Sequence, residues 1–132
     1  MPKHKGLTDL ADARGLLARL LAIADDAVIV AAETFVVVLF NQGAERIFGC
    51  GAAEAIGQPL ARWIPAAQRA QHDAHMRRFA ASPRASRRMG ERSDVRGQRA
   101  DGSLFEAEAS IAHLEIDGRM YFTAILRDVS DA

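Results

Sequence analysis

The fold is decided by the stretch Leu39-Phe40-Asn41-Gln42-Gly43-Ala44-Glu45-Arg46-Ile47-Phe48-Gly49. It begins at the end of a Val-rich apolar segment, and Asn41 is a favoured N-cap residue for a helix that starts just after it. Gly49 can adopt the left-handed conformation that ends many helices. The stretch therefore predicts a strand that passes directly into a short helix over residues 42–48.

An amphipathic helix is predicted well upstream of this stretch. Thr8 can cap it, and its apolar residues recur every three or four positions over residues 8–24. Asp25 and Asp26 end the helix. Because a single helix cannot bury such a stripe alone, we expect the helix to pack on the rest of the chain or on a partner copy. Residues 1–24 are accordingly interpreted as a flanking segment.

Five strands are predicted around a helical insertion, over residues 27–32, 35–40, 87–98, 104–114 and 120–129. Asp-Gly pairs tolerate the positive φ that tight turns require, and they supply both hairpins among the last three strands. A tight turn is expected at Glu33-Thr34, and Pro65 opens a longer helix over residues 65–81. The order of two strands, a helical insertion and three strands is typical of an antiparallel sheet with helices on one face, an α+β domain.

Further segments complete a known pattern. They are Glu54-Ala55-Ile56-Gly57-Gln58-Pro59-Leu60, Arg99-Ala100-Asp101-Gly102-Ser103-Leu104-Phe105, Ala109-Ser110-Ile111 and Arg127-Asp128-Val129-Ser130. Together with the opening stretch, in this order over residues 25–130, they resemble a PAS domain of the kind found in bacterial sensor histidine kinases. The resemblance implies a five-stranded antiparallel sheet in the order 2-1-5-4-3, with helices covering one face around an internal cavity.

The resemblance also implies a function. PAS domains are sensory modules of signal-transduction proteins of the histidine kinase or cyclase type. This chain would bind a small ligand or cofactor and relay the signal to a C-terminal output domain beyond Ala132. The alternative is a ligand-free dimerisation module that pairs through the helix over residues 8–24. An enzyme is not expected, because the sequence has no Gly-rich phosphate loop, nucleophile elbow or paired carboxylates in an apolar setting.

His72 is the main candidate for a cofactor ligand. On the helix over residues 65–81 it shares one face with Gln68, His75, Met76 and Phe79. The segment Arg69-Ala70-Gln71-His72-Asp73 resembles the one that bears the proximal haem histidine in rhizobial oxygen-sensing PAS kinases. That resemblance implies haem iron at His72, a distal wall at Ala109 and Ile111, and a nearby arginine that falls on Arg92 or on Ser93.

Two other interpretations of His72 remain open. The imidazole could be a partly buried group satisfied by a backbone carbonyl or a carboxylate. Alternatively, His72 and His75 could hold a divalent metal, although the sequence offers no clear third ligand. A flavin is not expected, since the Asn-Cys-Arg-Phe motif of flavin-linked PAS domains is missing and Cys50 is predicted to be a small, half-buried hydrophobe. Trp63 is expected to pack beneath the loop after Pro59, and His113 to face solvent.

Charge and hydropathy favour a cytoplasmic domain. The 17 basic residues balance the 17 acidic ones, and the arginine-rich part of the chain lacks interleaved aromatics, so nucleic-acid binding is not expected. The sequence shows no signal peptide and no apolar run long enough to cross a bilayer, so direct membrane contact is not expected either. The resemblance implies that Arg127 and Asp128, at the end of the last strand, hold and release the segment that follows. The alternative is a strand end with no special role.

Overall fold

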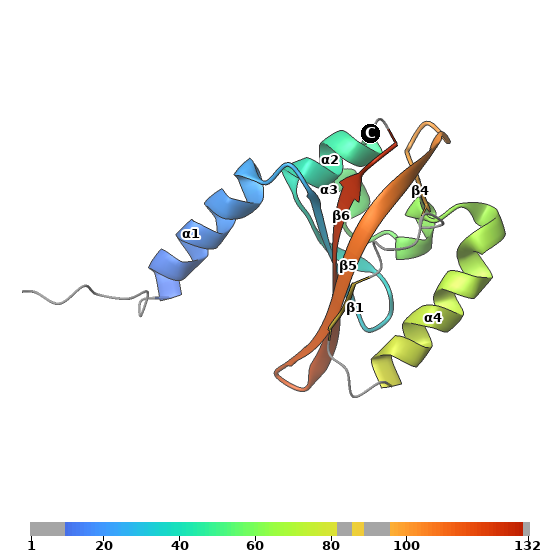
Figure 1. Cartoon of the computed structure of the whole chain (residues 1–132). Helices are drawn as coiled ribbons and strands as arrows, with labels where there is room; N and C mark the ends of the chain where they lie inside the picture. Colours follow the sequence, from blue (N-terminus) through green and yellow to red (C-terminus); the bar gives the residue numbers. More distant parts are fainter. Residues whose placement is uncertain (1–9, 82–85, 89–95, 131–132) are drawn as a thin grey trace, which may run out of the picture.

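The computed structural model describes residues 10–81, 86–88 and 96–130. One antiparallel sheet forms the body, α4 covers one of its faces, and α1 extends away on the opposite side (Figure 1). The elements are α1 (Leu10–Ile23), β1 (Ala27–Ala32), β2 (Val37–Phe40), α2 (Gln42–Phe48), α3 (Ala52–Ala55), two 3-10 turns (Leu60–Trp63 and Ala66–Gln68), α4 (Arg69–Ala81), β3 (Ser86–Arg88), β4 (Arg96–Gln98), β5 (Leu104–Ile116) and β6 (Arg119–Asp128).

The strand order confirms the predicted topology. The sheet runs β2-β1-β6-β5-β3, with β4 also paired to β5, so β3 and β4 together occupy the place of the expected third strand. The single strand predicted over residues 87–98 is wrong in detail. Arg88 pairs with Ser110 whereas Arg96 pairs with Glu106, so one continuous ladder cannot join the two short strands.

Two turns show where the backbone departs from extended geometry. In the hairpin between β5 and β6, Asp117 and Gly118 have φ of 51° and 78°, as the predicted Asp-Gly turn requires. Phe35 also has a positive φ, 66°. A bulky residue in this left-handed region interrupts the extended chain, so β2 begins at Val37 and not at residue 35 as predicted.

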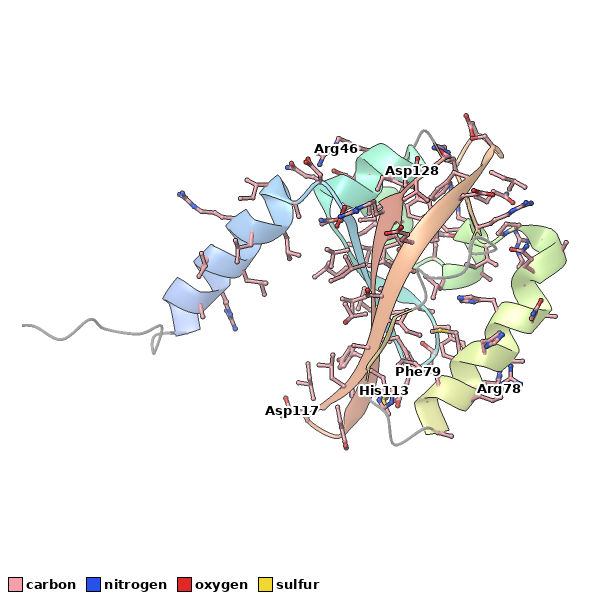
Figure 2. All side chains as sticks on the ribbon, viewed as in Figure 1. Arg46, Arg78, Phe79, His113, Asp117 and Asp128 are labelled. Atoms are coloured by element: carbon pink, nitrogen blue, oxygen red, sulfur yellow. The ribbon has the colours of Figure 1, made fainter. Side chains whose placement is uncertain are left out.

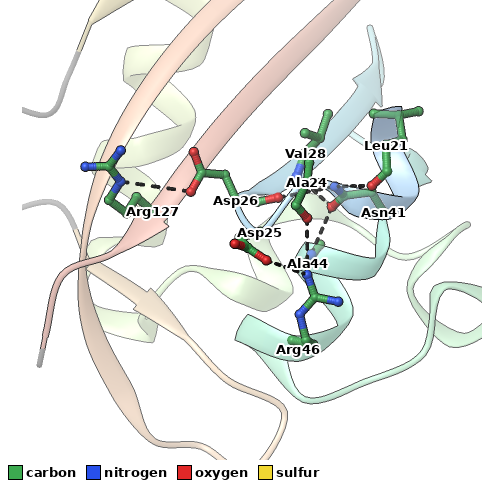
Figure 3. A network of polar contacts seen from close by, with 9 residues as sticks. All are labelled: Leu21, Ala24, Asp25, Asp26, Val28, Asn41, Ala44, Arg46 and Arg127. Carbon is green, nitrogen blue, oxygen red and sulfur yellow. Dashed lines mark hydrogen bonds and ion pairs between the residues drawn. The ribbon is translucent and has the colours of Figure 1, made fainter. Parts of the chain in front are cut away.

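Asn41 joins three segments at the start of α2, as the close-up in Figure 3 shows. Its Oδ1 accepts hydrogen bonds from the backbone N–H groups of Ala44 (2.9 Å) and Val28 (2.8 Å), which confirms the predicted cap. Its Nδ2 donates to the carbonyls of Leu21 (3.1 Å) and Asp26 (3.2 Å). The buried amide is thus fully used, and it fixes the end of α1 and the start of β1 against α2.

Gly43 lets these segments approach closely. A Cβ at this position would lie 2.2 Å from the carbonyl oxygen of Asp26, a contact that no side chain can make. Helix α2 can therefore sit directly on the linker between α1 and β1 only because residue 43 is glycine.

The inner face of the sheet carries two separate hydrophobic clusters. The first, here called the packed cluster, lies under α2, α3 and the first 3-10 turn, and its aromatic members are Phe40, Phe48, Trp63 and Phe105. The second, here called the α4 cluster, consists of Met76, Phe79 and Phe122 with partly buried neighbours. The alternation of residues along β5 shows why only one face of the sheet carries these clusters. Phe105, Ala107 and Ala109 are buried on that face, while Glu106 and Glu108 between them face solvent.

Candidate functional site

A cavity of about 240 Å³ lies between α4 and the inner face of the central strands. The predicted helix over residues 65–81 is α-helical only from Arg69, because a 3-10 turn precedes α4. All the residues predicted to share one helical face nevertheless line the cavity, namely Gln68 from that turn and His72, His75, Met76 and Phe79 from α4. Ala109 and Ile111 line it from β5, where the sequence places a distal wall. The structure thus brings together the predicted site residues, except Arg92 and its alternative Ser93, which lie outside the described residues.

His72 is half-buried on the cavity side of α4. Burial lowers the pKa of its imidazole, the neighbouring charge of His75 lowers that pKa further, and Asp73 opposes the shift by raising it. The ring is therefore neutral at pH 7, the form that can accept a hydrogen bond or bind a metal. Within residues 10–81, 86–88 and 96–130, nothing hydrogen-bonds to it, so the carbonyl or carboxylate partner of the alternative interpretation is not found there.

Aromatic contacts close the end of the cavity next to the β5–β6 hairpin. The rings of Phe79 and His113 meet edge to face at a centroid distance of 4.7 Å, and Figure 2 shows the two side chains beside each other between α4 and the sheet. Phe122 lies 6.5 Å from His113 on the other side. The prediction that His113 faces solvent is therefore wrong, because an inward position on β5 brings its ring under α4.

Trp63 forms the floor of the cavity. It is buried as predicted, and it packs against Phe40 and Phe48 at centroid distances of 5.4 and 6.2 Å. Its indole Nε1–H is buried but has no acceptor among the described residues. A buried donor without an acceptor lowers the free energy of unfolding by about 1–3 kcal/mol, so this nitrogen destabilises an otherwise well-packed region.

The cavity in this structure does not fit a haem. A cavity of about 150 Å³ is known to hold benzene, and sites for drug-sized ligands span roughly 300–1,000 Å³, so the present space of about 240 Å³ suits a much smaller guest. A haem also brings two propionate carboxylates. Of the described lining residues only Arg96 is an arginine or lysine, and this exposed residue lies opposite Glu106 across the β4–β5 ladder.

A divalent metal site has no better support. Over the described ranges of the chain, no group of three or more histidine, cysteine, aspartate or glutamate side chains is arranged to hold a metal ion. His72 and His75 therefore remain a pair without a third ligand. Cys50, the only cysteine, is half-buried against the packed cluster, as predicted.

Asp128 is held at the end of β6 by two neighbours. Arg99 donates to its carboxylate at 2.6 Å, and the Ser130 hydroxyl and backbone N–H donate at 2.6 and 3.0 Å. Burial raises the pKa of Asp128, but the hydrogen bonds from Ser130 and Arg99 together outweigh it and lower the pKa. The carboxylate is therefore charged and firmly bound at neutral pH.

Arg99, the partner of Asp128, is not among the residues that the sequence predicts for the signal relay. Arg99 precedes the Ala100–Ser103 turn, and its guanidinium also lies over the Phe105 ring at 4.5 Å. The register of the two long antiparallel strands could have located Arg99. It places Asp128 opposite Ala107, near the start of β5 and therefore near the turn that Arg99 precedes. Arg127 behaves differently, because its exposed side chain only approaches the Asp26 carboxylate, at 4.0 Å (Figure 3).

The sequence of this chain was compared with known families and structures. A family profile described as the PAS domain matches residues 25–131. The chain belongs to the PAS domain family. A PAS module is a regulatory sensory unit, and the sheet order and helical cover described above are those of this fold. No helix in the described part of the chain is long and apolar enough to cross a membrane.

Relatives and solved structures extend the comparison. The sensor protein FixL of Bradyrhizobium diazoefficiens is 34% identical over 108 residues, which cover 80% of this PAS chain and 21% of that protein. The chain thus spans about a fifth of the length of this relative. The PAS domain of an HTR-like protein from Haloarcula marismortui has a TM-score of 0.73 at 19% identity, covering 91% of this chain and 94% of that one. A PAS domain from a two-component sensor histidine kinase has a TM-score of 0.72 at 16% identity, covering 91% and 99%.

Proposed function

We propose that this PAS domain is a receptor for a small molecule, which binds in the cavity under α4. The observation that carries the proposal is a mostly apolar cavity lined by the neutral imidazole of His72, which has no hydrogen-bond partner among the described residues. Similarity to the sensor protein FixL supports a role in a bacterial signalling protein. The proposed role lies in the cytoplasm and upstream of an output domain. Met76, Phe79, Ala109 and Ile111 are the proposed contact residues for the guest.

Ligand-induced stabilisation tests the receptor function. A guest that binds the folded domain alone raises its unfolding temperature in proportion to the logarithm of guest concentration at saturation. Screening metabolites by thermal unfolding should find compounds with this dependence, and Ala109→Leu, which places a larger side chain in the cavity, should weaken it. A screen in which no shift is reduced by Ala109→Leu would place the binding elsewhere and refute the proposal.

Haem bound through His72 stays a prediction of the sequence. The position and protonation state of His72 support it, while the size and lining of the cavity speak against it. The absorption spectrum of the purified protein, with and without added haem, decides the question. A Soret band that is lost in His72→Ala would establish the cofactor, and a colourless protein that takes up no haem would exclude it.

The relay to an output domain is proposed to run through the end of β6. Asp128, bonded to Arg99 and Ser130, fixes the direction in which the chain leaves the sheet. Arg127 adds a weaker contact to Asp26, at the point where the chain enters β1. Amide hydrogen exchange of residues 127–130 should be slow, and it should accelerate in Asp128→Asn far more than in Arg127→Gln. Equal effects of the two changes would contradict this assignment.

Dimerisation through α1 is a second candidate function, favoured by a specific observation. The apolar side chains of Leu17, Leu20 and Ile23 are 55%, 51% and 74% exposed, so α1 leaves its apolar stripe uncovered. A partner copy would bury that stripe. Sedimentation equilibrium should show a dimer that Leu20→Glu disrupts and that the control Arg19→Glu leaves intact. A protein that stays monomeric at all concentrations would refute dimerisation through α1.

A further inference from the structure

The cavity under α4 has almost no charge with which to receive an ion. Of its described lining residues none is acidic. Arg96 is the one residue with a permanent positive charge, and it is exposed and opposite Glu106 in the β4–β5 ladder, on the side of β5 that faces solvent. His72 is neutral at pH 7. Uncharged polar side chains also line the cavity and could donate hydrogen bonds, namely Gln68, Gln71 and Thr123. An ionised guest would therefore lose its hydration with no charged partner except the exposed Arg96, which is costly.

The walls of the cavity set the size and polarity of the guest. Its volume of about 240 Å³ exceeds the space that holds benzene and falls short of a drug-sized site, so it suits a single ring system or a short chain. Most of the surface is apolar, contributed by residues such as Met76, Phe79 and Phe122. His72 offers one hydrogen-bonding group that no described residue uses.

We propose that the guest of this domain is an uncharged, mostly apolar small molecule with one hydroxyl or carbonyl group that hydrogen-bonds to His72. The inference rests on the proposed receptor function and narrows it to a chemical class. Ionised carboxylates and haem do not belong to that class, because each needs charge compensation or space that the described lining does not provide.

Two probes of equal chain length separate charge from shape. At pH 7.5, 1-octanol is uncharged and octanoate is an anion. Trp63 is the only tryptophan of the chain and forms the cavity floor, so its emission reports binding at this place. Titration with 1-octanol should change the Trp63 emission and raise the unfolding temperature. Octanoate should bind at least about 10-fold more weakly, since its buried carboxylate would lack a charged partner other than the exposed Arg96.

Three variants locate the guest. His72→Phe keeps an apolar ring but removes the hydrogen bond, and it should weaken 1-octanol binding about 3- to 10-fold. Ala109→Leu should weaken binding by narrowing the cavity. Ala53→Leu is the matched control, because residue 53 is exposed on α3 and does not line the cavity. It should leave the affinity unchanged.

The outcomes distinguish this inference from the receptor function on which it depends. Octanoate binding as tightly as 1-octanol, or uptake of haem, would overturn the uncharged class while leaving the cavity as a receptor. If His72→Phe leaves the affinity for 1-octanol unchanged, the guest does not hydrogen-bond to His72 and that part of the inference is wrong. Absence of any effect of 1-octanol on both Trp63 emission and unfolding temperature would overturn this inference alone. The receptor function would be overturned if the metabolite screen also found no stabilising compound.

Discussion

The packed cluster and the α4 cluster occupy the same face of one sheet, yet they fill their space differently. In the packed cluster, four aromatic rings meet at centroid distances between 5.4 and 6.2 Å, and Phe48 contacts three of them. Helix α4 buries only Met76 and Phe79, and a cavity of about 240 Å³ remains beneath it. The difference indicates that the packed cluster contributes most of the stability, whereas the region under α4 has room for the guest proposed above.

The largest effect should come from emptying the packed cluster. We expect Phe48→Ala to lower the free energy of unfolding by about 3–5 kcal/mol, because the ring is fully enclosed and its neighbours cannot collapse into the space. Phe79→Ala should cost roughly half as much or less, since among the described residues the α4 cluster contains three buried members whereas the packed cluster contains ten. Urea unfolding at equilibrium measures both changes. Equal losses would mean that the two clusters do not differ in packing.

A second test concerns the backbone contact that anchors α2. Gly43→Ala should destabilise the domain by about 1–3 kcal/mol, because the new Cβ meets the Asp26 carbonyl and backbone must move to relieve the clash. Gly15→Ala on α1 is the control, since a Cβ there has nothing within 4 Å and alanine favours the helix. Thermal unfolding should show a loss for the first change and none for the second.

A smaller effect should distinguish the α4 half by its pH dependence. The pKa of His72 lies below its ordinary value of 6.5 in the folded protein, so the unfolded chain binds the proton more readily. The stability contributed by the neutral ring is complete above pH 6.5 and declines as the pH falls from 6.5 to the lowered folded pKa. Urea midpoints between pH 7.5 and 5.5 should therefore fall less in His72→Phe than in the unchanged protein. A parallel decline in both proteins would exclude His72 as the source.

The smallest change is expected at Trp63, where the two halves meet. Trp63→Phe loses packing area but also removes the buried Nε1–H that has no acceptor in the described structure. These two contributions oppose each other, so the free energy of unfolding should change by less than about 1 kcal/mol. A loss of several kcal/mol in urea unfolding would show that the indole nitrogen has a partner in solution.

Much of the architecture could be predicted from local chemistry. Asn41, Gly49 and the Asp-Gly pairs act within a few residues of themselves, and the structure confirms the cap and the turns that they predict. The helical face of α4 could also be predicted, because spacing alone places His72, Met76 and Phe79 together.

Features that depend on distant partners could not be predicted in the same way. The split of the third strand arises from its register with β5, and the burial of His113 arises from the position of α4 above it. Arg99 was missed as the partner of Asp128 because 29 residues separate them in sequence. The volume of the cavity likewise depends on how far α4 stands from the sheet, which no local pattern encodes.

The pairing of β1 with β6 has a mechanical consequence. These two strands are antiparallel neighbours, and Ala27, where the chain joins the sheet, lies opposite Leu126, shortly before the chain leaves it. The chain therefore enters β1 and leaves β6 at the same end of the sheet. Both strands also border the cavity on their inner face. A change of a few degrees in the twist between these two strands would therefore change the angle between the two flanking segments.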